Sequence, residues 1–176
     1  AASTISGDGE ILVIGTQALH AQNRPVPRIA WISEDADVYP LHHPEMADEI
    51  DASIGELSPF HQTHGYYGHG VSPEVATLPE GWETRLIDFA DEQCGGAVGK
   101  CLDVHDLVLS KYAANRHKDH VFNREIIRHG FVNQKQLLKL LKLLPVDDEF
   151  REKIRRTILG HFKDAHPQNK AGITIH

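Results

Sequence analysis

The feature that most constrains the fold is a change of pattern near Leu102. Before it, short apolar runs are separated by Gly, Pro and polar clusters, and after it apolar residues recur with helical spacing. Strands with intervening helices, followed by helices alone, predict a mixed α/β (α+β) sheet and a C-terminal helical bundle. We therefore expect an α/β core over residues 1–102 and a helical region packed on it over residues 103–176.

The first part of the chain carries the strand signals. Residues 10–15 predict a buried strand that ends in glycine, and residues 16–22 predict a short helix directly after it. Residues 28–39 predict a second strand, which Pro40 stops. A helix is expected over residues 44–54, with proline in its first turn. Three weaker strand candidates follow, at residues 65–68, 83–89 and 97–102.

Helical spacing dominates the second part. Helices are predicted over residues 104–115, 117–129, 134–144 and 147–166. Asp103 or Asp106 is placed to cap or complement the start of the first, and Asn133 to cap the third. Pro145 ends the third helix.

Composition excludes several classes of protein. The 18 Lys+Arg against 25 Asp+Glu give a net charge of −7, which leaves little positive charge for sequence-independent binding to long duplex DNA. No apolar run of 18 residues is present and the first residues lack the pattern of a signal peptide, so we expect neither membrane insertion nor export. Cys94 and Cys101 are too far apart for a redox pair and indicate reduced thiols in a cytoplasmic protein.

The strongest chemical signal is Asp35-Ala36-Asp37-Val38. On a strand the two carboxylates project from one face, while Ala36 and Val38 turn into the core. Two carboxylates side by side repel each other unless a cation lies between them, so Asp35 and Asp37 are candidate ligands for Mg²⁺ or Mn²⁺. The alternative is an acidic strand end on the surface.

A second signal lies at Gly15-Thr16, between the first strand and the short helix. Glycine lets a phosphate approach the backbone, and the Thr16 hydroxyl can donate a hydrogen bond to it. The start of the following helix offers free N–H groups. An anion-binding turn would then face the two aspartates.

In this order the motifs resemble the nucleotidyltransferase-fold superfamily, which includes DNA polymerase beta, antibiotic adenylyltransferases and the minimal transferases of bacterial toxin–antitoxin systems. A narrower resemblance is to uncharacterised bacterial nucleotidyltransferase-like proteins. It spans about residues 11–144 and rests on the segments 15–18, 34–40, 65–67 and 106–111. Thr16 stands where the superfamily has Gly or Ser.

The resemblance implies a metal-dependent enzyme that moves a nucleotidyl group from an NTP to a hydroxyl acceptor. Asp35 and Asp37 would be catalytic metal ligands, and Gly15 and Thr16 would bind the nucleotide. Active members usually carry a third carboxylate on a later strand beside the first two. Asp88 is the candidate for this role, and Asp91 is close enough to compete. The alternative is that Asp88 is an ordinary acid at the end of a strand.

Lys111 is a further nucleotide-binding candidate. It looks like the phosphate-contacting lysine of the resembling group, and its helical neighbours include no acidic partner. An unpaired surface lysine is the alternative. Nearby, Arg116, Lys118 and Asp119 are expected to form a salt-bridged turn that ties the helical region to the sheet.

The chain has 13 histidines, several of them concentrated between His42 and His69. His61-x-x-His64 with a third histidine would suit structural zinc, but the surrounding Gly and Pro predict a loop and hairpin. The histidines would more simply line the mouth of a cleft, with Tyr66 and Tyr67 available to stack on a base or to pack in the core.

Two rival functions stay open at this point. One is a catalytically inactive nucleotidyltransferase-like binding or antitoxin-type module, and the other is a zinc-stabilised binding protein. The acceptor of the leading hypothesis is undetermined. The acidic net charge favours a small molecule, a protein or a tRNA end over long duplex DNA.

Overall fold

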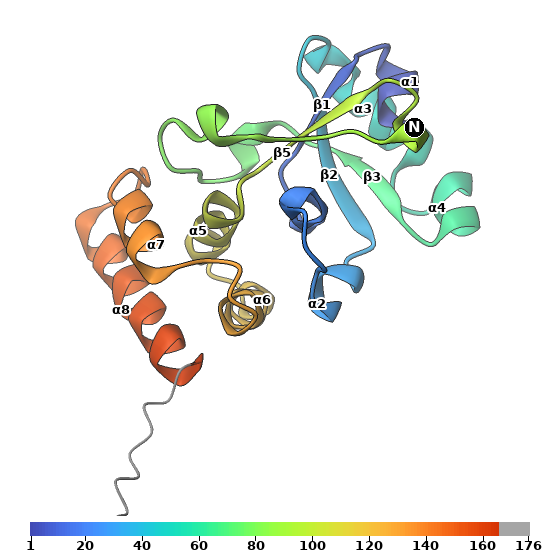
Figure 1. Ribbon diagram of the computed structural model, residues 1–176. Helices are drawn as coiled ribbons and strands as arrows, with labels where there is room; N and C mark the ends of the chain where they lie inside the picture. The colour runs from blue at the N-terminus through green and yellow to red at the C-terminus, as the bar shows by residue number, and fades with distance from the viewer. Residues whose placement is uncertain (166–176) are drawn as a thin grey trace, which may run out of the picture.

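The computed structural model describes residues 1–165 and contains a mixed five-stranded sheet (Figure 1). The strand order is β3-β2-β1-β5-β4. β1 pairs antiparallel with β2 and parallel with β5, while β2 and β3 are parallel and β4 and β5 are antiparallel. The bounds are β1 Glu10–Val13, β2 Asp35–Pro40, β3 Tyr67–Gly70, β4 Ile87–Phe89 and β5 Val98–Cys101.

Helices cover both faces of this sheet. The α-helices are α1 Ala2–Ser6, α2 Arg28–Trp31, α3 Ala47–Ile54, α4 Pro59–His64, α5 Val104–Ala114, α6 His117–Arg128, α7 Gln134–Leu141 and α8 Asp148–Ala165. Short 3₁₀ helices are η1 Thr16–Gln22, η2 Pro44–Met46, η3 Pro73–Val75, η4 Trp82–Arg85 and η5 Glu92–Cys94. Figure 1 shows α5 to α8 gathered on one side of the sheet, away from α1 and α3. No helix among residues 1–165 is long and apolar enough to cross a membrane.

Alternation along the strands divides the core in two. Ile11 and Val38 point to one face and pack with Ile50 and Ile54 of α3. Leu12 points to the other face and joins a larger cluster formed with η1 and the helices α5 to α8. Successive side chains of a strand point to opposite faces of the sheet. The residues next to Ile11 and Val38 along their strands therefore point to the face that packs against η1 and α5 to α8. This division fixes the direction in which the acidic residues of β2 point.

The predicted fold class is confirmed, and most predicted elements are present. The strand and short helix at the start of the chain, the helix after Pro44 and the helices after Leu102 all form. Asp103 accepts a hydrogen bond from the backbone N–H of His105, and Asn133 accepts one from Gln136, so both predicted caps are confirmed. The predicted last residue of the final helix, His166, lies outside the described residues.

Two local predictions are wrong. Residues 28–31 were expected to begin the second strand but form α2, so β2 begins only at Asp35 and runs through Pro40. The expected loop around His61 is instead the helix α4. Ser58 caps it by accepting a hydrogen bond from the N–H of His61, Pro59 occupies the first turn, and Gly65 ends it at φ +74°.

A buried carboxylate fixes the chain near the start of β1. Asp8 is almost fully buried and accepts hydrogen bonds from the backbone N–H groups of Glu10, His42 and His43. Its carboxylate also lies 3.0 Å from Nδ1 of His42. Burial opposes ionisation, but these hydrogen bonds outweigh it and lower the pKa of Asp8 from 3.8 to about 2.

We predict that Asp8→Asn lowers the melting temperature at pH 6 by about 2–4 °C, the effect of losing about 1 kcal/mol in a chain of this size. Because the folded pKa lies below the ordinary value, the stabilisation is present above about pH 4 and is lost as pH falls toward 2. Thermal unfolding from pH 6 to pH 2 checks this. The exposed Asp51→Asn is the control, and an Asp8→Asn deficit that does not shrink in acid would contradict the account.

Candidate active site

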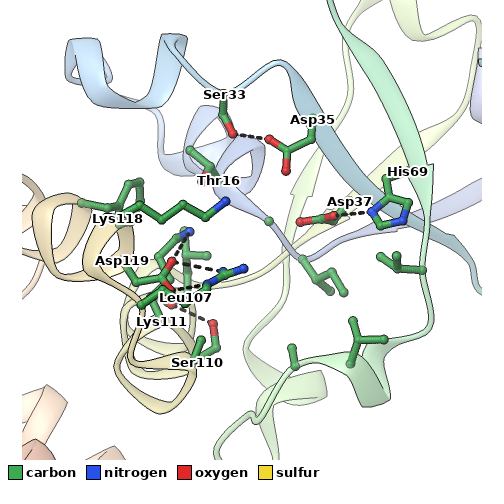
Figure 2. A pocket seen from close by; sticks show the side chains of 18 of the residues that line it. Thr16, Ser33, Asp35, Asp37, His69, Leu107, Ser110, Lys111, Lys118 and Asp119 are labelled. Atoms are coloured by element: carbon green, nitrogen blue, oxygen red, sulfur yellow. Dashed lines mark hydrogen bonds and ion pairs between the residues drawn. The ribbon is translucent and has the colours of Figure 1, made fainter. Parts of the chain in front are cut away.

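A pocket of about 850 Å³ lies between the acidic end of β2 and the α5–α6 corner. Figure 2 shows carboxylates on its sheet side and basic side chains on its helical side. Its volume is typical of sites that enclose a small molecule. The polar and charged residues that line it are Thr16, Ser33, Glu34, Asp35, Asp37, Glu56, Tyr67, His69, Thr77, Ser110, Lys111, Arg116, Lys118 and Asp119.

Asp35 and Asp37 project into this pocket from the same face of β2 (Figure 2). Ala36 and Val38 turn the other way and pack in the cluster formed with α3. The predicted alternation is therefore present, and the pair is not an acidic strand end on an open surface. Their neighbours on β3 are Tyr67, which is in register with Asp35, and His69, which is in register with Asp37.

Gly15 makes room for the second carboxylate. A Cβ atom built on Gly15 would overlap Oδ2 of Asp37, so any larger residue at this position would require the Asp37 side chain to move. The backbone there is extended, and the glycine is required by close approach rather than by an unusual dihedral angle. Thr16 follows at the start of η1 and is nearly buried. The predicted turn and the aspartates thus meet in one pocket.

The two carboxylates have few neutralising partners. Asp35 accepts a hydrogen bond from the Ser33 hydroxyl, and Oδ1 of Asp37 lies 3.3 Å from Nδ1 of His69. Burial and repulsion from Asp35 raise the pKa of Asp37, although His69 and Lys111 act in the opposite direction. A carboxylate whose pKa is raised in this way is one that a bound cation would stabilise.

The opposite wall is basic. Lys111 lies in the pocket wall with its side chain 15% exposed, and its Nζ is 3.6 Å from Oδ1 of Asp119 and 4.5 Å from the centre of the Phe122 ring. Arg116 donates two hydrogen bonds to Asp119, at 2.7 and 3.2 Å. Lys118 extends toward Thr16 (Figure 2). The expected salt bridge is confirmed for Arg116 and Asp119 but not for Lys118, which forms no ion pair among residues 1–165, and the turn lines the pocket.

The structure does not bring Asp88 to Asp35 and Asp37. Asp88 is on the edge strand β4, and the strands β5 and β1 lie between it and β2. Its carboxylate is exposed and bonds to Lys100 at 2.9 and 3.1 Å. The competing Asp91 caps η5 by accepting hydrogen bonds from two backbone N–H groups. Neither acid lines the pocket.

The strand that does lie beside the two aspartates carries a histidine. β3 pairs with β2, and at the register of Asp37 its residue is His69, half-exposed in the pocket wall. The superfamily resemblance led us to expect a carboxylate beside the pair. In residues 1–165, no group of three or more His, Cys, Asp and Glu side chains is arranged to hold a metal ion. The paired strands β2 and β3 thus contribute two carboxylates and one imidazole to the pocket wall, and Glu34 and Glu56 line the pocket beyond these strands.

The remaining histidines are dispersed. His42 pairs with Asp8, and His61 lies 3.3 Å from Glu34. Neither they nor His64 line the pocket, so the expectation that the histidines surround the cleft holds only for His69. Tyr67 lines the pocket, whereas Tyr66 does not. Burial raises the pKa of Tyr67, and the nearby carboxylates of Asp35 and Glu56 raise it further.

The sequence patterns did not single out Ser33, although it lies two residues before Asp35 and donates a hydrogen bond to it. His69 was expected at the mouth of the cleft, but its place beside Asp37 follows only from the pairing of β3 with β2. Lys118 and Asp119 follow a helix end at Asn115, whose left-handed conformation turns the chain back toward the sheet. The run of charged residues at 116–119 is the sequence feature from which their place in the pocket could have been predicted.

A family model described as "Nucleotidyltransferase of unknown function (DUF6036)" matches residues 2–164. The chain belongs to this family. Neither the curated proteins nor the solved structures contain a match. Membership in DUF6036 confirms the resemblance to nucleotidyltransferases drawn from the sequence motifs.

We predict that Gly15→Ala costs about 1–3 kcal/mol of folding free energy, because the new methyl group displaces the Asp37 carboxylate. Asp37→Ala removes the overlap, so the double variant will be more stable than the sum of the single effects by about 1 kcal/mol or more. Urea unfolding of the four proteins in this cycle measures the coupling.

Gly160→Ala is the matched control, since a Cβ there meets nothing within 4 Å and α8 is a regular helix. It is expected to be neutral or slightly stabilising. Strictly additive effects of Gly15→Ala and Asp37→Ala would show that the close approach is not what requires glycine.

Proposed function

We propose that this chain is a metal-dependent nucleotidyltransferase that uses an NTP as donor and a hydroxyl group as acceptor. The observation that carries the proposal is the facing arrangement of Asp35 and Asp37 with the basic residues of the α5–α6 corner across one pocket. Such a pocket suits a ligand that brings both a divalent cation and a chain of phosphates.

The pair of aspartates fits Mg²⁺ or Mn²⁺. Both carboxylates face one space, Gly15 leaves room for the Asp37 carboxylate, and burial together with repulsion from Asp35 raises the pKa of Asp37. Mg²⁺ commonly takes one or two protein carboxylates and completes its shell with water and phosphate oxygens. When bound, the cation would neutralise charge that develops on the transferred group.

The other residues then take defined roles. Thr16 and the N–H groups at the start of η1 would bind phosphate oxygens beside Gly15, and Lys111 would contact them from the helical side. The acceptor oxygen bonds to the α-phosphorus, the bond from that phosphorus to the bridging oxygen breaks, and pyrophosphate leaves with the electron pair. The hydroxyl proton passes to solvent. The acceptor is a small molecule, a protein or a tRNA end.

A second candidate function is a nucleotide-binding module that does not catalyse transfer. It is favoured by the position of Asp88, which lies on β4 outside the pocket, and by β3, where the residue in register with Asp37 is His69 and not a carboxylate. In active members of the superfamily, the third carboxylate is expected to help activate the acceptor hydroxyl. The two candidates share the NTP site and differ in turnover.

The test is transfer of label from an α-³²P-labelled NTP, measured with a mixture of hydroxyl acceptors and with Mg²⁺ or Mn²⁺. Asp35→Asn with Asp37→Asn is expected to reduce transfer by at least about 100-fold, because the ligands that neutralise the reacting phosphates are lost. Binding of a non-hydrolysable NTP with Mn²⁺ is measured on the same proteins by calorimetry.

Asp88→Asn is the matched control, since it makes the same chemical change at an acid outside the pocket, and it should retain transfer. Metal-dependent NTP binding without transfer to any acceptor would support the binding module. Binding and transfer by the double variant at the level of the parent protein would rule out the proposed site.

A further inference from the structure

The α5–α6 corner gathers more positive charge than one phosphate contact requires. Lys111 comes from the last turns of α5, Arg116 immediately precedes α6, and Lys118 lies in the first turn of α6. All three line the pocket together with the single carboxylate of Asp119. Three cations and one carboxylate leave an excess of two positive charges on this wall.

Asp119 is the buried centre of the group. Its side chain is only 1% exposed, and it contacts Arg116 through both oxygens and Lys111 through Oδ1. It therefore joins a residue of α5 to the residue that precedes α6 (Figure 2). Such a bidentate contact fixes the plane of a guanidinium, whose remaining N–H groups are left to face the pocket.

Lys118 differs from its two neighbours. Among residues 1–165 it forms no ion pair, and its side chain extends across the pocket toward Thr16. Arg116 is 58% exposed, so its outer face is also accessible to a ligand.

The electrostatics indicate that these cations act across the pocket. The carboxylates of Asp35 and Asp37 contribute to the raised pKa of Arg116, after the larger effect of its bond to Asp119. Burial lowers the pKa of Lys111, while Asp119 and Asp37 oppose that shift and favour the charged ammonium. Asp119 keeps a lowered pKa despite its burial because Arg116 and Lys111 stabilise its charge.

We infer that Arg116 and Lys118 join Lys111 in a subsite for the pyrophosphate end of the donor, and that Asp119 is the positioning residue that aims Lys111 and Arg116 at it. This inference rests on the proposed function for the identity of the donor. A donor held at the aspartates would direct its outer phosphates toward the wall that carries these three cations. The subsite would then hold the leaving pyrophosphate.

Inorganic pyrophosphate is the direct probe, since it needs neither an acceptor nor turnover. We expect the wild-type protein to bind it with an affinity that falls as salt rises. Arg116→Gln and Lys118→Gln should each weaken binding by about tenfold, the size of a lost charge-assisted contact. Calorimetry measures both the affinity and its salt dependence.

Two matched controls lie outside the pocket. Arg128→Gln removes an exposed arginine that pairs with Glu125 three residues away, as Arg116 pairs with Asp119. Lys139→Gln removes an exposed lysine of α7. Both should bind pyrophosphate like the wild type. If the pocket and control variants weaken pyrophosphate binding equally, the subsite is overturned, because binding would then depend only on the net charge of the protein.

Asp119→Asn tests the positioning role. It keeps the shape of the side chain but loses the charge that holds Arg116, so pyrophosphate and NTP binding should weaken by about tenfold in a protein that still unfolds cooperatively. In an active enzyme, KM for the NTP should rise more than kcat falls. If Asp119→Asn does not fold, Arg116→Gln alone decides the case.

The inference and the proposed function can fail separately. Mn²⁺ binding, followed by electron paramagnetic resonance, should be lost in Asp35→Asn with Asp37→Asn and retained in Lys118→Gln. Pyrophosphate binding that depends on Arg116 and Lys118 in a protein without transfer activity would keep the subsite and reject the enzyme. Transfer activity with unchanged NTP and pyrophosphate affinity in both variants would reject the subsite.

Discussion

The site depends on the repulsion between two carboxylates that β2 places on one face. Asp35 and Asp37 project together because Ala36 and Val38 are committed to the core on the other side. The packing of α3 against the sheet therefore sets the direction of the acids. Gly15 lets Asp37 pack against the turn after β1, and burial there raises the pKa of Asp37. The fold thus maintains a concentration of negative charge that a bound cation would relieve.

The rest of the pocket is arranged around that charge. The chain returns from the sheet through α5, reverses at Asn115, and brings Lys111 and Arg116 to face the aspartates. Asp119 connects these two basic residues from a buried position, so one carboxylate holds two of the three cations of the basic wall. The chain belongs to a family described as nucleotidyltransferases of unknown function, and the two opposed walls fit the metal-bound, phosphate-rich donor that we propose.

Sequence patterns correctly predicted those features that depend on residues close together in the chain. The period of two placed Asp35 and Asp37 on one face, and capping residues such as Asp103 located the helix starts. The prediction for residues 28–31 failed because four residues with β-branched and aromatic members suit a strand, yet the segment packs against η1 as a helical turn. Strand order is not encoded locally, so the sequence could not show that β1 and β5 separate Asp88 from β2 or that His69 adjoins Asp37.

The most direct test of the central claim is a crystal structure of the protein with a non-hydrolysable NTP and Mn²⁺, recorded at the manganese absorption edge. We expect an anomalous peak beside the carboxylates of Asp35 and Asp37, with the phosphates extending beside Thr16 toward Lys111. A nucleotide bound elsewhere on the chain, or phosphates held in this pocket with no metal on the two aspartates, would contradict it.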